Sequence, residues 1–367
     1  MTHCPVTSLR AATYVIPTDE PEADGTLTWD ETTMVVVHAT AGDEEGLGWS
    51  YASPAAQTVV TGMLAGVVEG RSALDVPGAT EAMNRAVRNV GREGIAATAI
   101  SAVDIALWDL KAKILGCALT TLLGRAHDSV PVYGSGGFTT YGSQRLRDQL
   151  TGWTEKLSIP RVKIKIGESW GSRESRDIER VALARKVIGD AAELYVDANG
   201  GYTTGQAIRM GAAFADYDVT WFEEPVSSQD LAGLAVIRSQ VSPDVTAGEY
   251  SWTPADSARL LDAAAVDCLQ ADVTRCGGVT GFLQAGALAA ARNVQISGHC
   301  APNLHAHVAA CVPNLRHVEY FHDHQRIEDL LFDGALSPHG GAMIPDPARP
   351  GLGLTLRVSD AEAYRQA

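Results

Sequence analysis

The pattern of apolar and polar residues changes near residue 126. Before that point, strand-like runs at 9–16 and 32–40 flank an acidic connection, which predicts an antiparallel sheet with a long lid loop at about 17–31. Helical periodicity follows in three segments, at residues 55–69, 80–89 and 95–115. Residues 1–125 are therefore predicted to form an α+β capping domain. The acidic connection suits either a solvated surface or a lid that selects the substrate.

Residues 126–340 alternate short β-rich runs with amphipathic helical segments. Eight strands are predicted, at residues 130–133, 162–166, 194–196, 219–222, 245–247, 268–271, 294–297 and 317–320. Eight is the number of strands in a (β/α)8 barrel. Residues 341–367 contain a further apolar run, 352–358, which we expect to pack back on the capping domain. The predicted fold class is α/β: a (β/α)8-type barrel with an N-terminal α+β capping domain that the C-terminal tail completes.

Composition narrows the possible partners. The 367 residues are 46% hydrophobic and carry a formal net charge of −15, with a pI of about 5.1. An acidic protein is a poor partner for nucleic acids and anionic membranes, because both bind basic surfaces. No apolar run approaches the roughly 18 residues of a membrane span, and residues 1–10 lack the apolar core of a signal peptide. We therefore expect a cytoplasmic homo-oligomer whose partner is a small molecule.

Two lysines, Lys163 and Lys165, lie two residues apart in the predicted strand at 162–166 and must point to the same side of it. Inside a barrel, burial and mutual repulsion would disfavour the charge on both ammonium groups, so that one lysine could act as a base near pH 7. The alternative is an edge strand whose two lysines extend to solvent. The spacing alone leaves both interpretations open.

Three carboxylates end consecutive predicted strands: Asp197, Glu223 and Glu249. Any one of them is explained equally well as a helix N-cap. Three at one mouth of a barrel would repel each other unless a cation lies among them, and a set of oxygen ligands suits Mg²⁺ better than Zn²⁺. The sequence therefore predicts one Mg²⁺ per subunit. Glu224, directly after Glu223, is an alternative ligand that strand alternation does not exclude.

Asp272 and His299 end the next two predicted strands. A carboxylate that accepts a hydrogen bond from an imidazole on the adjacent strand leaves the other ring nitrogen free as an acid or base. Glu319, on the last strand, is expected to reach the same cavity. The six cysteines include no C-x-x-C pair and are predicted to be free thiols, with Cys300 close to this position.

The ordered motifs Lys-Ile-Lys, Asp-Ala-Asn-Gly, Phe-Glu-Glu-Pro, Ala-Gly-Glu, Gln-Ala-Asp and Gly-His resemble the enolase superfamily, and within it the mandelate racemase subgroup (the mandelate racemase/muconate lactonizing enzyme family). The resemblance covers nearly the whole chain. It implies that the magnesium ligands are Asp197, Glu223 and Glu249. It also implies that Asn199 lies near the metal. The lysine that the muconate-cycloisomerase-like subgroup has after its sixth strand is replaced here by Asp272.

The same resemblance implies roles for the remaining residues. Lys165 would be one base, and His299 with Asp272 the other. Lys163 and Glu319 match positions that contact the substrate carboxylate. These roles imply removal of a proton α to a carboxylate, which produces an enediolate.

Two outcomes of that step remain open. In an acid-sugar dehydratase, His299 would protonate a departing β-hydroxyl group; in a racemase, epimerase or lactone cycloisomerase, the second group would serve the opposite face of the carbon. The resemblance favours the dehydratase, a hydro-lyase, and the acidic character of residues 19–31 favours a hydroxylated substrate such as a sugar acid. A non-catalytic barrel that retains the metal site is a third hypothesis.

Histidines are frequent near the end of the barrel. Two interpretations are a second metal site and structural hydrogen bonds. His322 is expected to line the substrate pocket. The histidines concerned are His305, His307, His317, His322 and His324.

Overall fold

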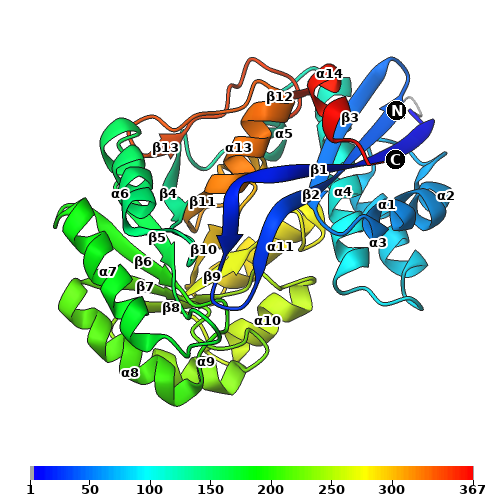
Figure 1. Cartoon of the computed structure of the whole chain (residues 1–367). Helices are drawn as coiled ribbons and strands as arrows, with labels where there is room; N and C mark the ends of the chain where they lie inside the picture. Colours follow the sequence, from blue (N-terminus) through cyan, green and yellow to red (C-terminus); the bar gives the residue numbers. More distant parts are fainter. Residues whose placement is uncertain (1–3, 367) are drawn as a thin grey trace.

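The computed structural model describes residues 4–366, so Met1 to His3 and Ala367 of the predicted terminal segments lie outside the described residues. The N-terminal part is a three-stranded antiparallel sheet covered by helices (Figure 1). Its strands are β1 (Ser8–Ala23), β2 (Thr28–Ala41) and β3 (Glu44–Tyr51). Its helical segments are α1 (Ala55–Val59), the π-helical turn η1 (Val60–Leu64), α2 (Ala65–Val68), α3 (Val76–Ala86), α4 (Ile95–Ile114) and α5 (Leu119–Leu123). The three predicted helical segments are present, whereas β3 and α5 were not predicted.

The apolar run of β2 contributes to two cores, because alternate residues of a strand point to opposite faces of the sheet. Met34 and Val36 pack in the core that the sheet shares with the barrel. Val35 and Val37 pack in the core formed with the helices of the capping domain. A continuous apolar run therefore marks the strand that lies between the two domains.

Gly48 in β3 allows a close approach of α4. A Cβ atom at this position would lie 2.3 Å from the carbonyl oxygen of Ala102 and 2.5 Å from the backbone nitrogen of Ala106. Because only a shift of α4 would relieve these contacts, Gly48→Ala is expected to lower the free energy of unfolding by about 3 kcal/mol. Gly66→Ala, where a Cβ meets nothing within 4 Å, is the control and should be neutral or slightly stabilising. Chemical denaturation measures both, and equal losses would contradict this packing.

The second part is a closed barrel of eight parallel strands in chain order, with β11 paired to β4. The strands are β4 (Val130–Gly136), β5 (Arg161–Lys165), β6 (Glu193–Asp197), β7 (Val219–Glu223), β8 (Asp244–Ala247), β9 (Cys268–Ala271), β10 (Gln295–Gly298) and β11 (Leu315–Phe321). The helical segments outside the strands are α6 (Ser143–Thr151), η2 (Gly152–Lys156), α7 (Glu174–Ile188), α8 (Thr204–Phe214), η3 (Ala215–Tyr217), α9 (Leu231–Arg238), α10 (Pro254–Asp262), α11 (Gly278–Ala290), α12 (Pro302–Ala309) and α13 (His322–Leu331). Each predicted strand overlaps an observed one, and the predicted fold class is confirmed.

Residues 17–31 were predicted as a loop, but this segment forms the end of the β1–β2 hairpin. The strands are joined by a tight turn, in which Asp24 Oδ1 accepts a hydrogen bond from the backbone nitrogen of Leu27 at 2.8 Å. Strand pairing shifts register between Pro17 and Glu22, which interrupts the alternation that identifies a strand in a sequence. The hairpin extends from the capping domain toward the barrel (Figure 1).

The C-terminal segment contacts both domains. Strand β13 (Ala342–Met343) pairs with β4, and β14 (Thr355–Leu356) pairs with β12 (Phe332–Asp333). The segment ends in α14 (Val358–Ala361) and η4 (Glu362–Tyr364). The backbone nitrogen of Gln366 then donates a 2.9 Å hydrogen bond to the carbonyl oxygen of Thr13 in β1. The tail thus begins on the barrel and ends on the capping domain.

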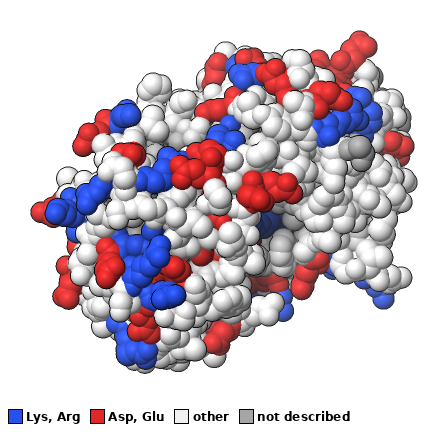
Figure 2. All heavy atoms as spheres, in the orientation of Figure 1, with Lys and Arg blue, Asp and Glu red and all other residues white. Residues whose placement is uncertain are grey.

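The surface carries charges of both signs. Acidic and basic side chains are intermixed on the face shown in Figure 2. Within residues 4–366, none of the helices combines the length and the apolar character needed to cross a membrane.

Candidate active site

A cavity of about 240 Å³ lies where the hairpin covers the carboxyl ends of the barrel strands. This is the end at which (β/α)8 barrels assemble their active sites. Residues of the hairpin line one side, and residues that follow barrel strands line the other. The lining comprises Asp24, Leu27, Trp29, Glu31, Thr32, Lys165, Asn199, Glu249, Tyr250, Arg275, His299, Cys300, Phe321 and His324.

Lys163 and Lys165 are both buried at the end of β5, so the solvent-exposed edge strand is wrong. Lys163 Nζ forms ion pairs with Glu223 and, at 2.8 Å, with Glu319. Lys165 Nζ lies 2.5 Å from Asp197 Oδ2. Burial lowers the pKa of Lys165, but attraction to the Asp197 carboxylate outweighs burial and the pKa lies above its ordinary value. The expected lowering of a lysine pKa is therefore not found, because each ammonium group faces a carboxylate.

Asp197, Glu223 and Glu249 each bring one carboxylate oxygen to within 4.8 Å of the others. All three side chains are buried. Within residues 4–366, Asn199 Oδ1 is buried and accepts no hydrogen bond, whereas Glu249 Oε2 has His299 Nε2 at 3.2 Å. Buried oxygen atoms without a donor cost free energy unless a ligand satisfies them. This donor set fits a hard divalent cation such as Mg²⁺.

The metal-sized cluster contains Glu223 rather than Glu224. Glu223 ends β7, where Lys163 contacts one of its oxygens and Trp221 Nε1 donates to the other at 2.9 Å. Glu224 follows with a backbone φ of 35°, in the left-handed region. Burial and repulsion from Glu249 raise the pKa of Glu224. The backbone conformation after β7 therefore directs Glu223, and not Glu224, into the carboxylate cluster.

Buried carboxyl groups outnumber cationic side chains around the cavity. The carboxyl groups are Asp197, Glu223, Glu224, Glu249, Asp272 and Glu319, and the cationic groups are Lys163, Lys165, Arg275 and, when protonated, His299. Two carboxyl groups are left without a compensating charge, which equals the charge of one divalent cation. Burial, opposed by Lys163 and reinforced by Asp197, raises the pKa of Glu223. The electrostatic balance therefore also favours a bound dication.

His299 and Asp272 lie in contact on adjacent strand ends. His299 Nδ1 is 2.9 Å from Asp272 Oδ2, and Asp272 Oδ1 accepts two 2.7 Å hydrogen bonds from the backbone nitrogen and hydroxyl group of Thr274. These bonds fix the carboxylate and hence the imidazole, whose Nε2 lies on the side of the cavity, 3.2 Å from Glu249 Oε2. Burial lowers the pKa of His299, but contacts with Cys300 and Glu249 outweigh burial and raise it above the ordinary value.

Glu319 lies behind the cavity wall rather than in its lining. Its Oε1 accepts hydrogen bonds from Ser135 Oγ at 2.6 Å and from Lys163 Nζ at 2.8 Å. Its Oε2 accepts a 2.9 Å hydrogen bond from the backbone nitrogen of Cys300. Glu319 therefore connects Lys163 with the residue that follows His299.

The structure places His322 outside the lining, contrary to our expectation. His322 begins α13, and its Nε2 lies 3.1 Å from Asp19 Oδ2 in β1. His324 lines the cavity instead and stacks on Tyr51 with 3.4 Å between ring centroids. Two residues along a helix are rotated by about 200° from each other. His322 and His324 therefore point to opposite sides of α13, and only His324 faces the cavity.

Three other histidines form hydrogen bonds within the protein, in agreement with their structural interpretation. His305 Nδ1 lies 2.7 Å from the Cys300 carbonyl, His307 Nδ1 lies 2.8 Å from the Asn303 carbonyl, and His317 Nδ1 lies 2.9 Å from Ser297 Oγ.

The sequence did not identify Trp29 and Arg275 as lining residues. Arg275 Nη1 lies 3.2 Å from Glu249 Oε1, and its Nε lies 3.4 Å from Asp272 Oδ2. Arg275 could have been predicted, because it lies three residues after Asp272, a carboxylate at a strand end. Trp29 carried none, because its segment was interpreted as a loop.

Glu22, buried in the hairpin, should make stability depend on pH. Burial, reinforced by Asp323, raises its pKa from 4.5 to about 8. A carboxyl group with a raised folded-state pKa stabilises the fold at low pH, and this contribution is lost as pH rises from the unfolded pKa through the folded one. Between pH 5 and pH 9 the wild type is expected to lose on the order of 4 kcal/mol relative to Glu22→Gln. Denaturation at pH 5, 7 and 9 measures this, with the exposed Glu44→Gln as control; parallel curves for wild type and Glu22→Gln would contradict it.

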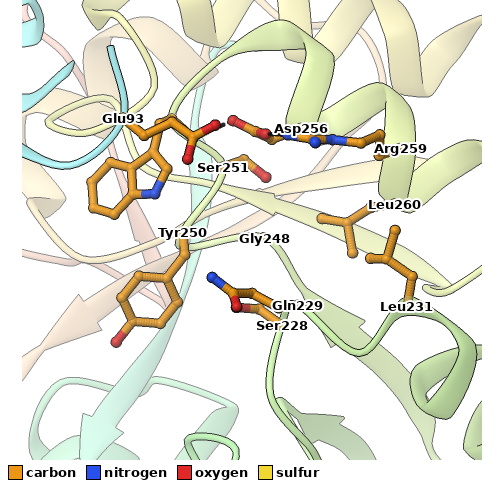
Figure 3. A pocket seen from close by; sticks show the side chains of 11 residues that line it. Glu93, Ser228, Gln229, Leu231, Gly248, Tyr250, Ser251, Asp256, Arg259 and Leu260 are labelled. Carbon is orange, nitrogen blue, oxygen red and sulfur yellow. Dashed lines mark hydrogen bonds and ion pairs between the residues drawn. The ribbon is translucent and has the colours of Figure 1, made fainter. Parts of the chain in front are cut away.

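A second cavity, of about 300 Å³, borders the β8–α10 loop (Figure 3). Its wall includes Ser228, Gln229 and Ser251 of the barrel and Glu93 of the capping domain. Tyr250 lines both cavities. The larger cavity has neither lysine nor histidine in its lining, so we assign the candidate chemistry to the smaller one.

The chain matches two family models. Residues 10–124 match the N-terminal domain of mandelate racemase / muconate lactonizing enzyme, and residues 145–361 match the enolase C-terminal domain-like model. With the barrel and the buried carboxylates, these matches define an enolase-superfamily protein. More narrowly, the chain belongs to the mandelate racemase/muconate lactonizing enzyme family.

Individual relatives differ in their reactions. L-talarate/galactarate dehydratase from Salmonella typhimurium is 33% identical over 318 residues, which cover 85% of this chain and 77% of the relative. A solved mandelate racemase/muconate lactonizing enzyme-like protein from Rubrobacter xylanophilus has 49% identity and a TM-score of 0.95, covering 99% of this chain and 100% of that one. A racemase from Streptomyces coelicolor, solved with bound magnesium, has 29% identity and a TM-score of 0.92, with 98% and 100% coverage. Other curated relatives are an arabinonate dehydratase, a D-gluconate dehydratase and a D-galactarolactone cycloisomerase.

Proposed function

We propose that this protein is a Mg²⁺-dependent enzyme that removes the proton α to a carboxylate, and that it dehydrates a sugar acid. The observation that carries this proposal is one cavity lined by Lys165 from the second barrel strand, by His299 after the seventh, and by Glu249 of the carboxylate cluster. Dehydration is preferred because the relatives above include three sugar-acid dehydratases.

The proposed ligands of one Mg²⁺ per subunit are Asp197, Glu223 and Glu249, with Asn199 near them. When bound, Mg²⁺ supplies electrophilic stabilisation of the negative charge that develops on the substrate carboxylate. The enediolate is too basic to form at useful rates in water, so charge stabilisation must contribute on the order of 10 kcal/mol or more.

The remaining steps are proton transfer and binding of the substrate carboxylate, which we assign to different side chains. Lys165 takes the α-proton on one side of the substrate. This role requires its neutral form, which a cation held by Asp197 would favour by cancelling the carboxylate attraction that raises the pKa of Lys165. His299, held through Nδ1 by Asp272, donates a proton from Nε2 to the departing β-hydroxyl group. Lys163 and Glu319 are the residues that the family resemblance assigns to the substrate carboxylate. They pair at 2.8 Å behind the cavity lining, so we propose that they reach the carboxylate only after their side chains shift.

Racemisation or cycloisomerisation is the second candidate, supported by the cycloisomerase and the racemase among the relatives and by three apolar residues in an otherwise polar lining. Leu27, Trp29 and Phe321 present apolar surface to the substrate. In this scheme His299 returns a proton to carbon instead of oxygen, which requires no change in the residues.

Incubation with Mg²⁺ and a panel of sugar acids in D₂O, followed by proton NMR, separates the candidates. A 2-keto-3-deoxy acid product supports dehydration. Deuterium at the α-carbon without net product indicates racemisation or epimerisation. No reaction across a broad panel, with Mg²⁺ bound, would contradict the dehydratase proposal and favour a non-catalytic barrel.

A further inference from the structure

Three unlike side chains, His299, Cys300 and Glu319, meet beside the carboxylate cluster. Cys300 Sγ lies 3.4 Å from His299 Nε2 and 3.4 Å from Glu319 Oε2, and the last two atoms are 3.7 Å apart. All three side chains are buried. His299 and Cys300 also line the cavity, so a group bound by these atoms would have one side open to it.

These separations match one face of a tetrahedral metal site. Zn²⁺ binds sulfur at about 2.3 Å and nitrogen or oxygen at about 2.0–2.2 Å, so that tetrahedral ligand atoms stand roughly 3.3–3.6 Å apart. The three protein atoms stand at 3.4, 3.4 and 3.7 Å. Little movement of the side chains is needed to form three bonds to such an ion.

The chemistry of the ligands separates this cluster from the magnesium ligands. Sulfur and imidazole nitrogen select Zn²⁺ or Cd²⁺, whereas three carboxylates select Mg²⁺. Burial raises the pKa of the Cys300 thiol, so the thiol carries its proton when no soft cation is present. Formation of the metal–sulfur bond breaks the S–H bond, formation of the metal–nitrogen bond displaces the proton on His299 Nε2, and both protons are released to solvent.

We propose that His299, Cys300 and Glu319 form a second metal site, which binds a thiophilic divalent cation such as Zn²⁺ and thereby inhibits the enzyme. The cation occupies Nε2 of His299, the atom that the reaction needs as a proton donor. The inhibition rests on the proposed function, whereas the binding depends only on the three ligands.

Titration of the Mg²⁺-saturated protein with Cd²⁺ tests the site through the ultraviolet sulfur-to-cadmium charge-transfer band. We expect a band that saturates at one Cd²⁺ per chain, persists in the control Cys311→Ser and is lost in Cys300→Ser. Circular dichroism verifies that both variants fold. The absence of a band from the wild type, or a band that survives in Cys300→Ser, would overturn the proposed site.

The wild type alone gives a second test that requires no variant to fold. With excess Mg²⁺ and a turned-over substrate, one equivalent of Cd²⁺ is expected to abolish most of the turnover while the charge-transfer band forms. Full turnover while the band is present would contradict the proposed inhibition but not the proposed metal site. The band without any turnover on any substrate would instead count against the proposed function.

Discussion

Lys165→Ala and His299→Asn are each expected to lower kcat by on the order of 10³-fold or more while the fold is retained, because each variant removes a group that transfers a proton in the reaction. Lys165 and His299 line the same cavity, and the variants leave the carboxylate cluster in place. Steady-state kinetics with the substrate identified by the sugar-acid panel, together with circular dichroism, measures the effect.

Matched controls exist on the surface. Lys186 and His339 are both exposed and lie outside the cavity lining. Lys186→Ala and His339→Asn should therefore retain wild-type kcat. Unchanged turnover in Lys165→Ala or His299→Asn would refute the scheme with two proton-transfer groups.

Asp197→Asn and Glu249→Gln are expected to weaken Mg²⁺ binding by on the order of 10²-fold or more, because each replaces a buried carboxylate ligand with a neutral amide. Activity should be lost in both variants. Asp197 also holds Lys165 at 2.5 Å, so activity alone cannot separate the two roles of this carboxylate. The binding must be measured directly.

Thermal or chemical denaturation with and without Mg²⁺ provides this measurement. At 100 times its dissociation constant, Mg²⁺ is expected to stabilise the wild type by about 2.7 kcal/mol. The exposed Asp190→Asn control should show the same gain, and Asp197→Asn should gain at most about 0.4 kcal/mol at that concentration. Full stabilisation of Asp197→Asn by Mg²⁺ would contradict the proposed ligand set.

The sequence predicted the barrel well because its strands are short, apolar and closed by ionisable residues. Asp197 and Glu223 are the last residues of β6 and β7, and Glu249 follows β8 after one intervening residue. Parallel strands bring such residues to one end, so their spatial grouping needed no tertiary information beyond the fold.

Features that depend on tertiary packing were predicted poorly. The hairpin was interpreted as a loop because a register shift between Pro17 and Glu22 breaks its alternation. His322 was expected to line the pocket, but the sequence did not show that it pairs with Asp19 of the hairpin while His324 lines the cavity. The pKa of Lys165 was expected to fall, since the sequence showed the neighbouring lysine but not that Asp197 lies 2.5 Å away.

The central claim is that the α-hydrogen of the substrate leaves as a proton under the control of Lys165. The most direct measurement follows the label when a substrate carrying deuterium at the α-carbon is turned over in ordinary water with Mg²⁺. The account predicts that the deuterium appears in the solvent and that Lys165→Ala releases none. A product that retains the α-deuterium would contradict the account.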